Sequence, residues 1–235
     1  MKKLSTGKLA LIVVALLVGG TAWFGYSNQS KELSNPDDAA AQTAEKESAA
    51  EAPKPSAAVF KPAKNDIVFG QATAPITIID YSSLSCPHCA HFHAQVLPKL
   101  QKKYIDTGKA KLVFRHFPLN APALRAAQLV NCADEKQKPN FLKVLFELQP
   151  QWSFTESFVQ QLKQIASVGG IDSAQFDSCI ADKSGESAVI STRNRAAEEA
   201  KVNATPTFFI NGVKLDDAPE MDAFDAAIAK ATPKP

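Results

Sequence analysis

The stretch ITIIDYSSLSCPHCAHFH, residues 76–93, decides the fold of this chain. Its first eight residues, 76–83, are dense in β-branched side chains and predict a buried strand. Cys86 and Cys89 follow directly, and Pro87 occupies the position where a proline starts a helix without the loss of a hydrogen bond. The stretch therefore predicts a strand, then a C-x-x-C pair, then a helix.

The helical pattern continues beyond this stretch. Large apolar side chains recur four residues apart, at Phe92, Val96 and Leu100. Pro98 falls inside the predicted helix, where it lacks a donor and should kink the axis, and Gly108 is the expected C-cap. Residues 111–117, KLVFRHF, predict a second strand. Together these elements form a β-α-β unit, which should be right-handed with parallel strands.

The next part of the chain is predicted to be helical before the strand pattern returns. Glycine, proline or polar breaks separate five predicted helices, at residues 121–133, 139–148, 155–168, 173–181 and 186–200. Residues 205–212, TPTFFING, predict a strand, and Asn211 with Gly212 predicts a tight hairpin turn into residues 213–215. A helix at 221–231 completes the pattern. The predicted order is β-α-β, a helical insertion, then β-β-α, which is an α/β fold.

Residues 1–26 have the pattern of an export signal. Lys2, Lys3 and Lys8 precede an uncharged and mostly apolar run that ends in aromatic side chains. Because no small-x-small cleavage site directly follows that run, an uncleaved membrane anchor is favoured over a removed signal peptide. Either segment would export the rest of the chain.

Residues 27–60 differ from the rest in composition. They are rich in Ala, Ser, Glu, Lys and Pro with few large apolar side chains, so they predict a flexible linker. The folded domain should then comprise residues 61–120, a helical insertion at 121–200, and residues 201–235. The net charge is only +2 and no basic patch interleaved with aromatic residues is present, so no nucleic-acid partner is expected.

The sequence CPHCAHFH, residues 86–93, allows two kinds of site. Its cysteines and histidines are ligand types that zinc prefers, yet the same C-x-x-C at a strand-to-helix junction can present a reactive thiolate. On one helix Cys89 and His93 share a face while His91 points elsewhere, so the ligands do not converge. A redox dithiol without bound metal is favoured. His91 is expected in solvent, and His93 and His116 are expected to be partly buried packing or hydrogen-bonding groups.

Three motifs carry a resemblance to a known family. CPHC at 86–89, FRHFPLN at 114–120 and TPTFFING at 205–212 resemble the DsbA-like thiol:disulfide oxidoreductases. This resemblance covers most of residues 67–231 and implies a thioredoxin-like fold with an inserted all-helical domain. It also implies a periplasmic protein that donates disulfides to newly exported polypeptides.

Four residues are predicted to carry that chemistry. Cys86 is the expected nucleophile, since the N–H groups and dipole at a helix N-terminus stabilise a thiolate. His88 in the same turn can add a hydrogen bond or a positive charge, and Cys89 should be the buried resolving cysteine. Asp80 ends the predicted central strand, where related proteins are similar in carrying an acidic residue that exchanges protons with the buried cysteine. The alternative for Asp80 is a solvated strand end.

The resemblance also implies a substrate-binding loop. Thr205 and Pro206 match the loop that holds a cis-proline opposite the dithiol, where the backbone before the proline can pair with an extended substrate. Pro87 is assigned to the same substrate-binding set. The alternative for Pro206 is a trans proline in an edge strand.

Two further cysteines lie in the predicted helical insertion. An even number of cysteines in an exported chain favours pairing, so Cys132 and Cys179 are expected to form a structural disulfide. Loop-closure entropy gives such a bridge about 3 to 4 kcal/mol of stabilisation. Two buried free thiols are the alternative.

The favoured function is a dithiol oxidase held at the inner membrane by its N-terminal helix and acting outside the cytoplasm on reduced exported polypeptides. The expected reoxidant is a membrane quinone-linked protein of the DsbB or VKOR type, and no cofactor is expected. Two alternatives stay open: a disulfide isomerase or reductase on the same scaffold, and a metal-binding or non-catalytic chaperone module that uses CPHCAHFH.

Overall fold

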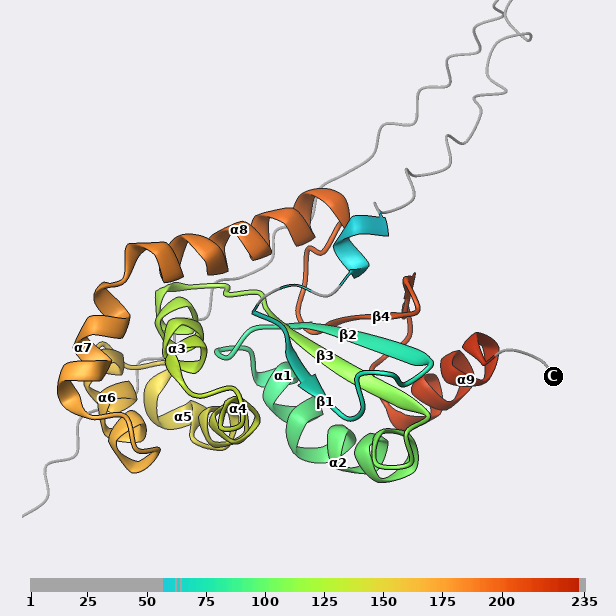
Figure 1. The fold of residues 1–235 in the computed structure, drawn as a ribbon, viewed down its shortest axis with the longest axis horizontal. Helices are drawn as coiled ribbons and strands as arrows, with labels where there is room; N and C mark the ends of the chain where they lie inside the picture. Colours follow the sequence, from blue (N-terminus) through green and yellow to red (C-terminus); the bar gives the residue numbers. More distant parts are fainter. Residues whose placement is uncertain (1–56, 62, 64, 233–235) are drawn as a thin grey trace, which may run out of the picture. The chain divides into compact units, whose positions relative to one another are not determined.

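The computed structural model of the protein describes residues 57–61, 63 and 65–232, all within one compact unit. A five-stranded sheet with the strand order β1-β3-β2-β4-β5 forms its centre (Figure 1). The strands are β1 (Ile67–Phe69), β2 (Ile76–Ser82), β3 (Ala110–His116), β4 (Thr207–Ile210) and β5 (Val213–Lys214). The central pair β2–β3 is parallel, as predicted, and the other three pairs are antiparallel.

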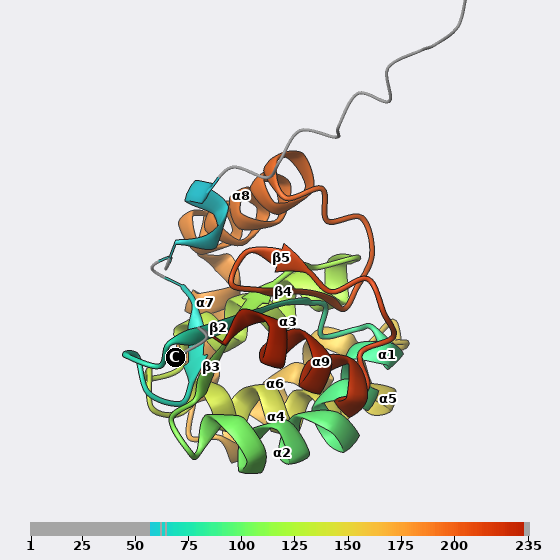
Figure 2. The same ribbon diagram turned by 90° about the vertical axis from the view of Figure 1, so that its right-hand side faces the viewer.

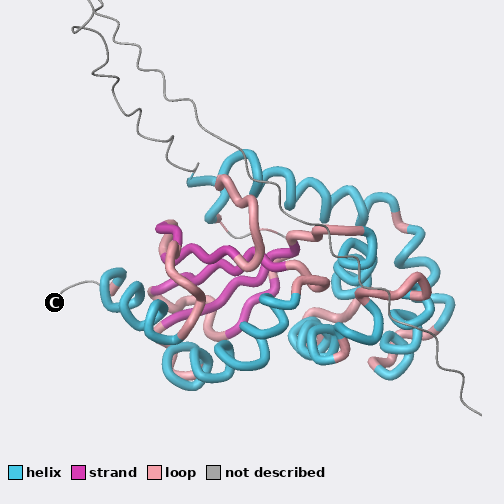
Figure 3. The backbone as a smooth tube through the Cα atoms, turned by 180° about the vertical axis from the view of Figure 1, so that it is seen from behind, coloured by secondary structure: helices cyan, strands magenta, loops and turns pink. Residues whose placement is uncertain are grey.

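The helices surround this sheet. They are η1 (Ala57–Phe60), α1 (Pro87–His91), η2 (Phe92–Val96), α2 (Leu97–Leu100), η3 (Gln101–Ile105), α3 (Ala121–Cys132), α4 (Lys138–Glu147), α5 (Gln149–Trp152), α6 (Phe158–Val168), α7 (Ser173–Ala181), α8 (Lys183–Glu199) and α9 (Met221–Ala231). Seen from behind, α3 to α7 gather beside the sheet as a separate helical layer (Figure 3). The fold is therefore thioredoxin-like with a helical insertion between β3 and β4.

The short elements differ most from the sequence prediction. β1 and α5 were not predicted, because three or four residues are too few to display a hydrophobic period. The predicted hairpin between β4 and β5 is present, and its turn residues Asn211 and Gly212 have φ values of 48° and 85°. Both angles lie in the left-handed region that a tight two-residue hairpin turn requires.

The helical path after Cys86 is continuous but changes its winding. α1 passes into η2, a π-helical turn in which the N–H of Leu97 donates to the carbonyl of Phe92, five residues earlier. Pro98 follows at once and has no N–H to offer the carbonyl of Ala94. The position of the predicted kink thus coincides with the end of a π-helical turn, where the winding of the backbone changes.

The two faces of the sheet have different coverings, since successive side chains of a strand point to opposite sides. The α1 face carries Ile78 and Asp80 of β2 and packs against α1, η2, α2, α4 and α9. The α8 face carries Ile79 and Tyr81 and packs against η1 and α8. Figure 2 shows these layers, with α8 and η1 on one side of the strands and α2 and α9 on the other.

The folded domain begins earlier than predicted. Val59, placed by the sequence in the linker of residues 27–60, is 2% exposed and belongs to the apolar cluster on the α8 face. Arg115 of β3 holds this segment by donating to the carbonyl oxygens of Val59 and Lys61. Asp66 accepts from Arg115 at 2.7 and 2.8 Å. The composition of the sequence did not predict η1, because this short helix contains only two large apolar side chains.

The predicted anchor or signal peptide (residues 1–26) and the predicted linker up to residue 56 lie outside the described residues. Within the described part of the chain, no helix is both long and apolar enough to cross a membrane.

Candidate active site

Cys86 stands at the junction of β2 and α1, where the sequence placed it. It is the N-cap of α1, with Pro87 in the first turn, and its own N–H donates to the carbonyl of Ser83 at 3.0 Å. Cys86 is 6% exposed and Cys89, one turn further on, is fully buried. Both are free thiols. The junction thus offers one sulfur near the surface and one behind it.

Gln149, from α5 of the helical insertion, holds this junction in place. Its Nε2 donates to the carbonyl of Leu84 at 2.7 Å and to the carbonyl of Cys86 at 3.0 Å. Gln149 is 3% exposed, so both bonds are shielded from water. Sequence reasoning missed this residue, because no spacing or motif links it to a loop more than sixty residues earlier.

The loop before β4 lies directly against the reactive junction. The peptide bond between Thr205 and Pro206 is cis. The Sγ of Cys86 lies 3.3 Å from the carbonyl oxygen of Thr205. The Oγ1 of Thr205 is buried and has no hydrogen-bond partner among the residues that the structure describes. The structure thus brings the predicted loop and Cys86 together, while Pro87 is exposed at the start of α1.

The pKa values of the two thiols are shifted in opposite directions. The pKa of Cys86 is lowered to about 5, first by a hydrogen bond from the Cys89 thiol, then by Thr205 and the backbone N–H groups of Cys89 and His88, against the effect of burial. The pKa of Cys89 is raised, first by burial, then by its hydrogen bond to Cys86 and the negative charge of Asp80. Near neutral pH the site therefore holds a thiolate at Cys86 and a thiol at Cys89.

His88 contributes to the site through its backbone. Its backbone N–H stabilises the Cys86 thiolate, whereas its side chain is exposed. The predicted contribution of the imidazole ring stays a prediction.

Asp80 lies behind Cys89 on the α1 face. It is fully buried inside β2, with two strand residues after it, so the alternative of a solvated strand end is wrong. Ser82 Oγ donates to one carboxylate oxygen in a short hydrogen bond, and the other oxygen lies 3.0 Å from Nε2 of His93. The register partners of Asp80 on the two neighbouring strands are Phe114 of β3 and Phe208 of β4.

The histidines do not converge on a common point. His93 is paired with Asp80 and stacked on Phe146 at a ring-centroid distance of 4.2 Å, as a hydrogen-bonding and packing group. His91 is 60% exposed and lies 3.7 Å from Glu220. In the described part of the chain no cluster of three or more Cys, His, Asp or Glu side chains could hold a metal ion.

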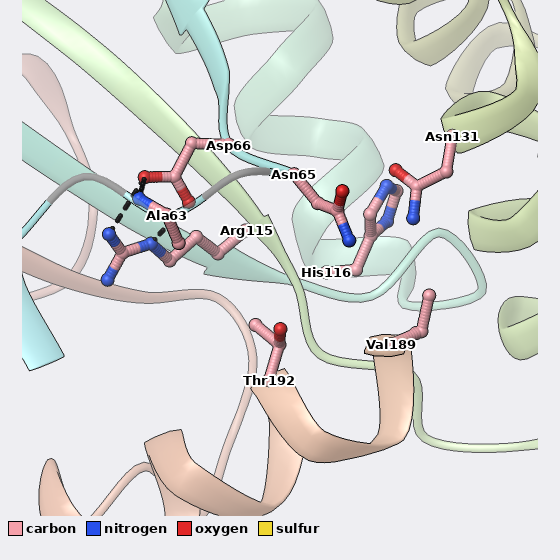
Figure 4. Close-up of a pocket in the computed structure, with 8 residues that line it drawn as sticks. All are labelled: Ala63, Asn65, Asp66, Arg115, His116, Asn131, Val189 and Thr192. Atoms are coloured by element: carbon pink, nitrogen blue, oxygen red, sulfur yellow. Dashed lines mark hydrogen bonds and ion pairs between the residues drawn. The ribbon is translucent and has the colours of Figure 1, made fainter. Parts of the chain in front are cut away.

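His116 lies in a small polar cavity between β3, α3 and α8 (Figure 4). Its Nε2 and the Oδ1 of Asn131 are buried and have no hydrogen-bond partner among the described residues. The cavity has room for about one water molecule, which could bond to both atoms. Burial, and to a lesser extent the positive charge of Lys138, lowers the pKa of His116 to about 3.

The remaining cysteines lie at a different place in the molecule. Cys132, the last residue of α3, and Cys179 of α7 form a disulfide with a Cα–Cα distance of 6.2 Å. That separation lies inside the usual range for a disulfide. The bridge ties two helices of the insertion together, and Cys179 Sγ lies 3.5 Å from the carbonyl of Gln128 in α3.

Known proteins share this arrangement. A thioredoxin family profile matches residues 62–230 of the chain. The "Putative protein-disulfide oxidoreductase" of Rickettsia prowazekii is 32% identical over 179 residues, which are 76% of this chain and 65% of that relative. The chain thus spans slightly under two thirds of the length of this relative.

Two solved structures have the same fold. The crystal structure of Wolbachia pipientis alpha-DsbA1 is 34% identical, covers 74% of this chain and 94% of that one, and has a TM-score of 0.69. Oxidised BdbD from Bacillus subtilis has a TM-score of 0.65 over 72% of this chain and 93% of that one, but at 24% identity it supports the fold alone. With its fold, its C-x-x-C junction and these relatives, the chain belongs to the DsbA-like branch of the thioredoxin superfamily.

Proposed function

We propose that this chain is a thiol:disulfide oxidoreductase that works as a dithiol oxidase on reduced exported polypeptides. The observation that carries the proposal is the unequal acidity of the two thiols, with the pKa of Cys86 lowered to about 5 and that of Cys89 raised. A stabilised Cys86 thiolate favours the reduced enzyme, so the Cys86–Cys89 disulfide is readily passed to another dithiol.

The proposed reaction has two exchanges. A substrate thiolate attacks the Sγ of Cys86, the Cys86–Cys89 bond breaks, and the electron pair leaves on Cys89, which takes up a proton. The second substrate thiolate then attacks the first substrate sulfur in the mixed disulfide. Cys86 leaves as the thiolate, and the substrate is oxidised by two electrons while the enzyme is reduced. A low pKa makes Cys86 a good leaving group in this second step.

The Thr205 loop is the proposed docking site for the substrate backbone. Its carbonyl oxygen lies 3.3 Å from the Sγ of Cys86, so a chain bonded through that sulfur would run beside the loop. Edge pairing of this kind gives affinity through main-chain hydrogen bonds and accepts many sequences. Pro87 is proposed to border the same surface, since it is exposed beside Cys86.

The setting of the reaction is also a proposal. The apolar run in residues 1–26 supports a domain held at the membrane outside the cytoplasm, where reduced exported chains appear. Reoxidation would come from a membrane quinone-linked partner of the DsbB or VKOR type, so the domain itself needs no cofactor.

Two measurements on the full-length chain test the direction of the reaction. Thiolate absorbance against pH should show Cys86 ionising near pH 5, and equilibration with glutathione buffers should give an oxidising potential. A Cys89→Ala variant serves as the comparison, because it removes the side-chain donor that lowers the Cys86 pKa most and should therefore raise that pKa. A Cys86 that ionises near its ordinary value of about 8.5, with a strongly reducing potential, would assign the chain to the reductases instead.

A further inference from the structure

The proton that Cys89 gains or loses needs a route, because neither Cys89 nor Asp80 reaches solvent. We propose that His93 and Asp80 form a proton relay, which connects the Cys89 thiol to a groove between α1, η2 and α4. The proposal rests on the redox function of Cys86 and Cys89 and assigns to His93 a role in that reaction. His93 acts through Asp80 and does not touch the reacting sulfurs, so it is a positioning residue.

The inner end of the relay is closed to water. Cys89, Asp80 and Ser82 are all fully buried. Ser82 donates to Asp80, and both side chains act on the Cys89 thiol, Ser82 through its hydroxyl and Asp80 through its negative charge. The carboxylate is therefore placed to exchange a proton with the thiol, but these three residues offer that proton no exit.

His93 supplies the outer end. Its Nε2 lies 3.0 Å from the Asp80 carboxylate, and its side chain is 5% exposed. Together with Pro87, Ala90, Lys143 and other side chains of α1, η2, α4 and α5, His93 lines a groove of about 890 Å³. The described lining of this groove does not include Thr205 or Pro206. Pro87 is the one proposed substrate-binding residue in that lining, so a substrate held at the Thr205 loop would border the groove at Pro87 and leave its α4 side open to water.

The ring of His93 is held in a fixed position. It stacks on Phe146 of α4 with an interplanar angle of 22°, and the rings of Phe92 and Phe114 meet it edge-on at 5.3 and 5.5 Å. These three side chains fix the ring plane, and the carboxylate fixes one nitrogen. An imidazole held this way exchanges protons without a change of rotamer, as a general acid or base must.

Other charges around the pair are few and partly balanced. They are Cys86, Cys89 and His91 from α1, His116 from β3, and Lys143 and Glu147 from α4. Lys143 and Glu147 pair with each other at 3.9 Å on the exposed side of the groove. The described groups thus leave His93 as the one titratable side chain that joins Asp80 to the groove.

A single-turnover reaction separates the two cysteines. The reduced full-length chain is mixed with one equivalent of an aromatic disulfide whose released thiolate is coloured. Cys86 attacks and releases the first thiolate. Cys89 then gives its proton to Asp80, attacks the Cys86 sulfur of the mixed disulfide, and expels the second thiolate as the Cys86–Cys89 bond forms. The first colour phase reports Cys86 and the second reports Cys89.

The relay predicts a selective change. His93→Gln should leave the first phase unchanged and slow the second phase by about ten- to a hundredfold near neutral pH, with loss of an inflection from its pH profile. In His93→Ala, free imidazole should restore the second phase. His91→Gln, on the same helical stretch but exposed, is the matched control and should change neither phase.

Three results would overturn the proposal. The first is a second phase that is unchanged in His93→Gln. The next is an equal slowing of both phases, which would mean that His93 only supports the packing. The last is full additivity of His93→Gln with Asp80→Asn, since members of one relay must not act independently. If His93→Ala does not fold, His93→Gln and the double variant still test the relay. A first phase without a low-pKa thiolate would instead count against the oxidase function and leave the relay standing.

Discussion

The two faces of the sheet each bury an aspartate, and the partners of those aspartates differ. On the α8 face, Asp66 receives two hydrogen bonds from Arg115, whose remaining donors reach Val59, Lys61 and Tyr81. On the α1 face, Asp80 has one hydroxyl and one imidazole and lies beside a thiol. The buried Asp66–Arg115 ion pair, with several further hydrogen bonds around it, holds distant segments of the chain together. The Asp80 carboxylate has only a hydroxyl and an imidazole as partners, which is the arrangement on which the proposed proton relay rests.

The largest effect that this comparison predicts is on folding stability. Asp66→Ala leaves a buried guanidinium without its counter-charge and should lower the free energy of unfolding by about 3 to 5 kcal/mol. Asp80→Asn, which keeps the size of the side chain and a hydrogen-bonding group at the same place, should change it by about 1 kcal/mol or less. Urea unfolding of the oxidised proteins measures both values.

Asp225→Asn is the control for this experiment, because its pairing with Lys103 is partly exposed and should contribute less than about 1 kcal/mol. Equal losses at Asp66 and Asp80 would remove the distinction between the two faces.

The stability of the protein in acid should depend on His116, which lies in the cavity between β3, α3 and α8 and whose Nε2 has no hydrogen-bond partner among the described residues. Its pKa is about 3 in the folded protein and near 6.5 when unfolded, so the unfolded state binds the proton first. The stability that its neutral form provides is fully present above about pH 6.5 and is lost as the pH falls towards 3. At pH 4 the loss should be about 3 kcal/mol.

His116→Gln should flatten that part of the stability profile, and unfolding midpoints measured from pH 7 to pH 4 provide the test. A wild-type profile that the substitution leaves unchanged would show that His116 is not the acid-sensitive group.

Gln149→Leu is expected to have a smaller effect at the edge of the α1 face. It keeps the side-chain volume but removes the hydrogen bonds that Gln149 donates to the carbonyls of Leu84 and Cys86, which should cost about 1 to 3 kcal/mol of stability. Because the Cys86 carbonyl also accepts from Ala90, the start of α1 should persist. Thermal unfolding and hydrogen exchange at residues 84–90 measure the change, with Gln151→Leu, an exposed residue, as control.

The smallest predicted effect is at Tyr81, which supports Arg115 on the α8 face. Tyr81→Phe removes one acceptor at 3.0 Å from a guanidinium that keeps Asp66 and two carbonyls, so the loss should be about 1 kcal/mol. Denaturant unfolding checks it. A loss as large as that of Asp66→Ala would mean that the phenol, and not the ion pair, holds the N-terminal segment.

Much of the fold could be predicted from the sequence where local chemistry decides it. Pro87 behind Cys86 starts a helix, and Asn211 with Gly212 makes a hairpin turn, because each depends on the backbone of a few neighbouring residues. β1 and η1 could not be predicted, because their positions depend on β3 and α8, which lie far along the chain.

In the candidate site, too, some features follow from the local sequence and others depend on distant parts of the chain. Cys86, Cys89 and Thr205 were found by motif, and the structure brings them together. The pairing of His93 with Asp80 depends on how a helix packs on a strand, and the bonds of Gln149 depend on where the insertion docks. Neither has a signal in the local sequence pattern.

The two hydrogen bonds of Gln149 restrict how this fold can be recombined. A helical insertion taken from a relative would bring its own surface to the Cys86 junction, and the graft would remain compatible only with a donor at the position of Gln149. The insertion and the C-x-x-C motif therefore depend on each other structurally, although some sixty residues separate them in sequence. Exchange of helical insertions within this family should succeed most often when the donor insertion carries a glutamine at the position of Gln149.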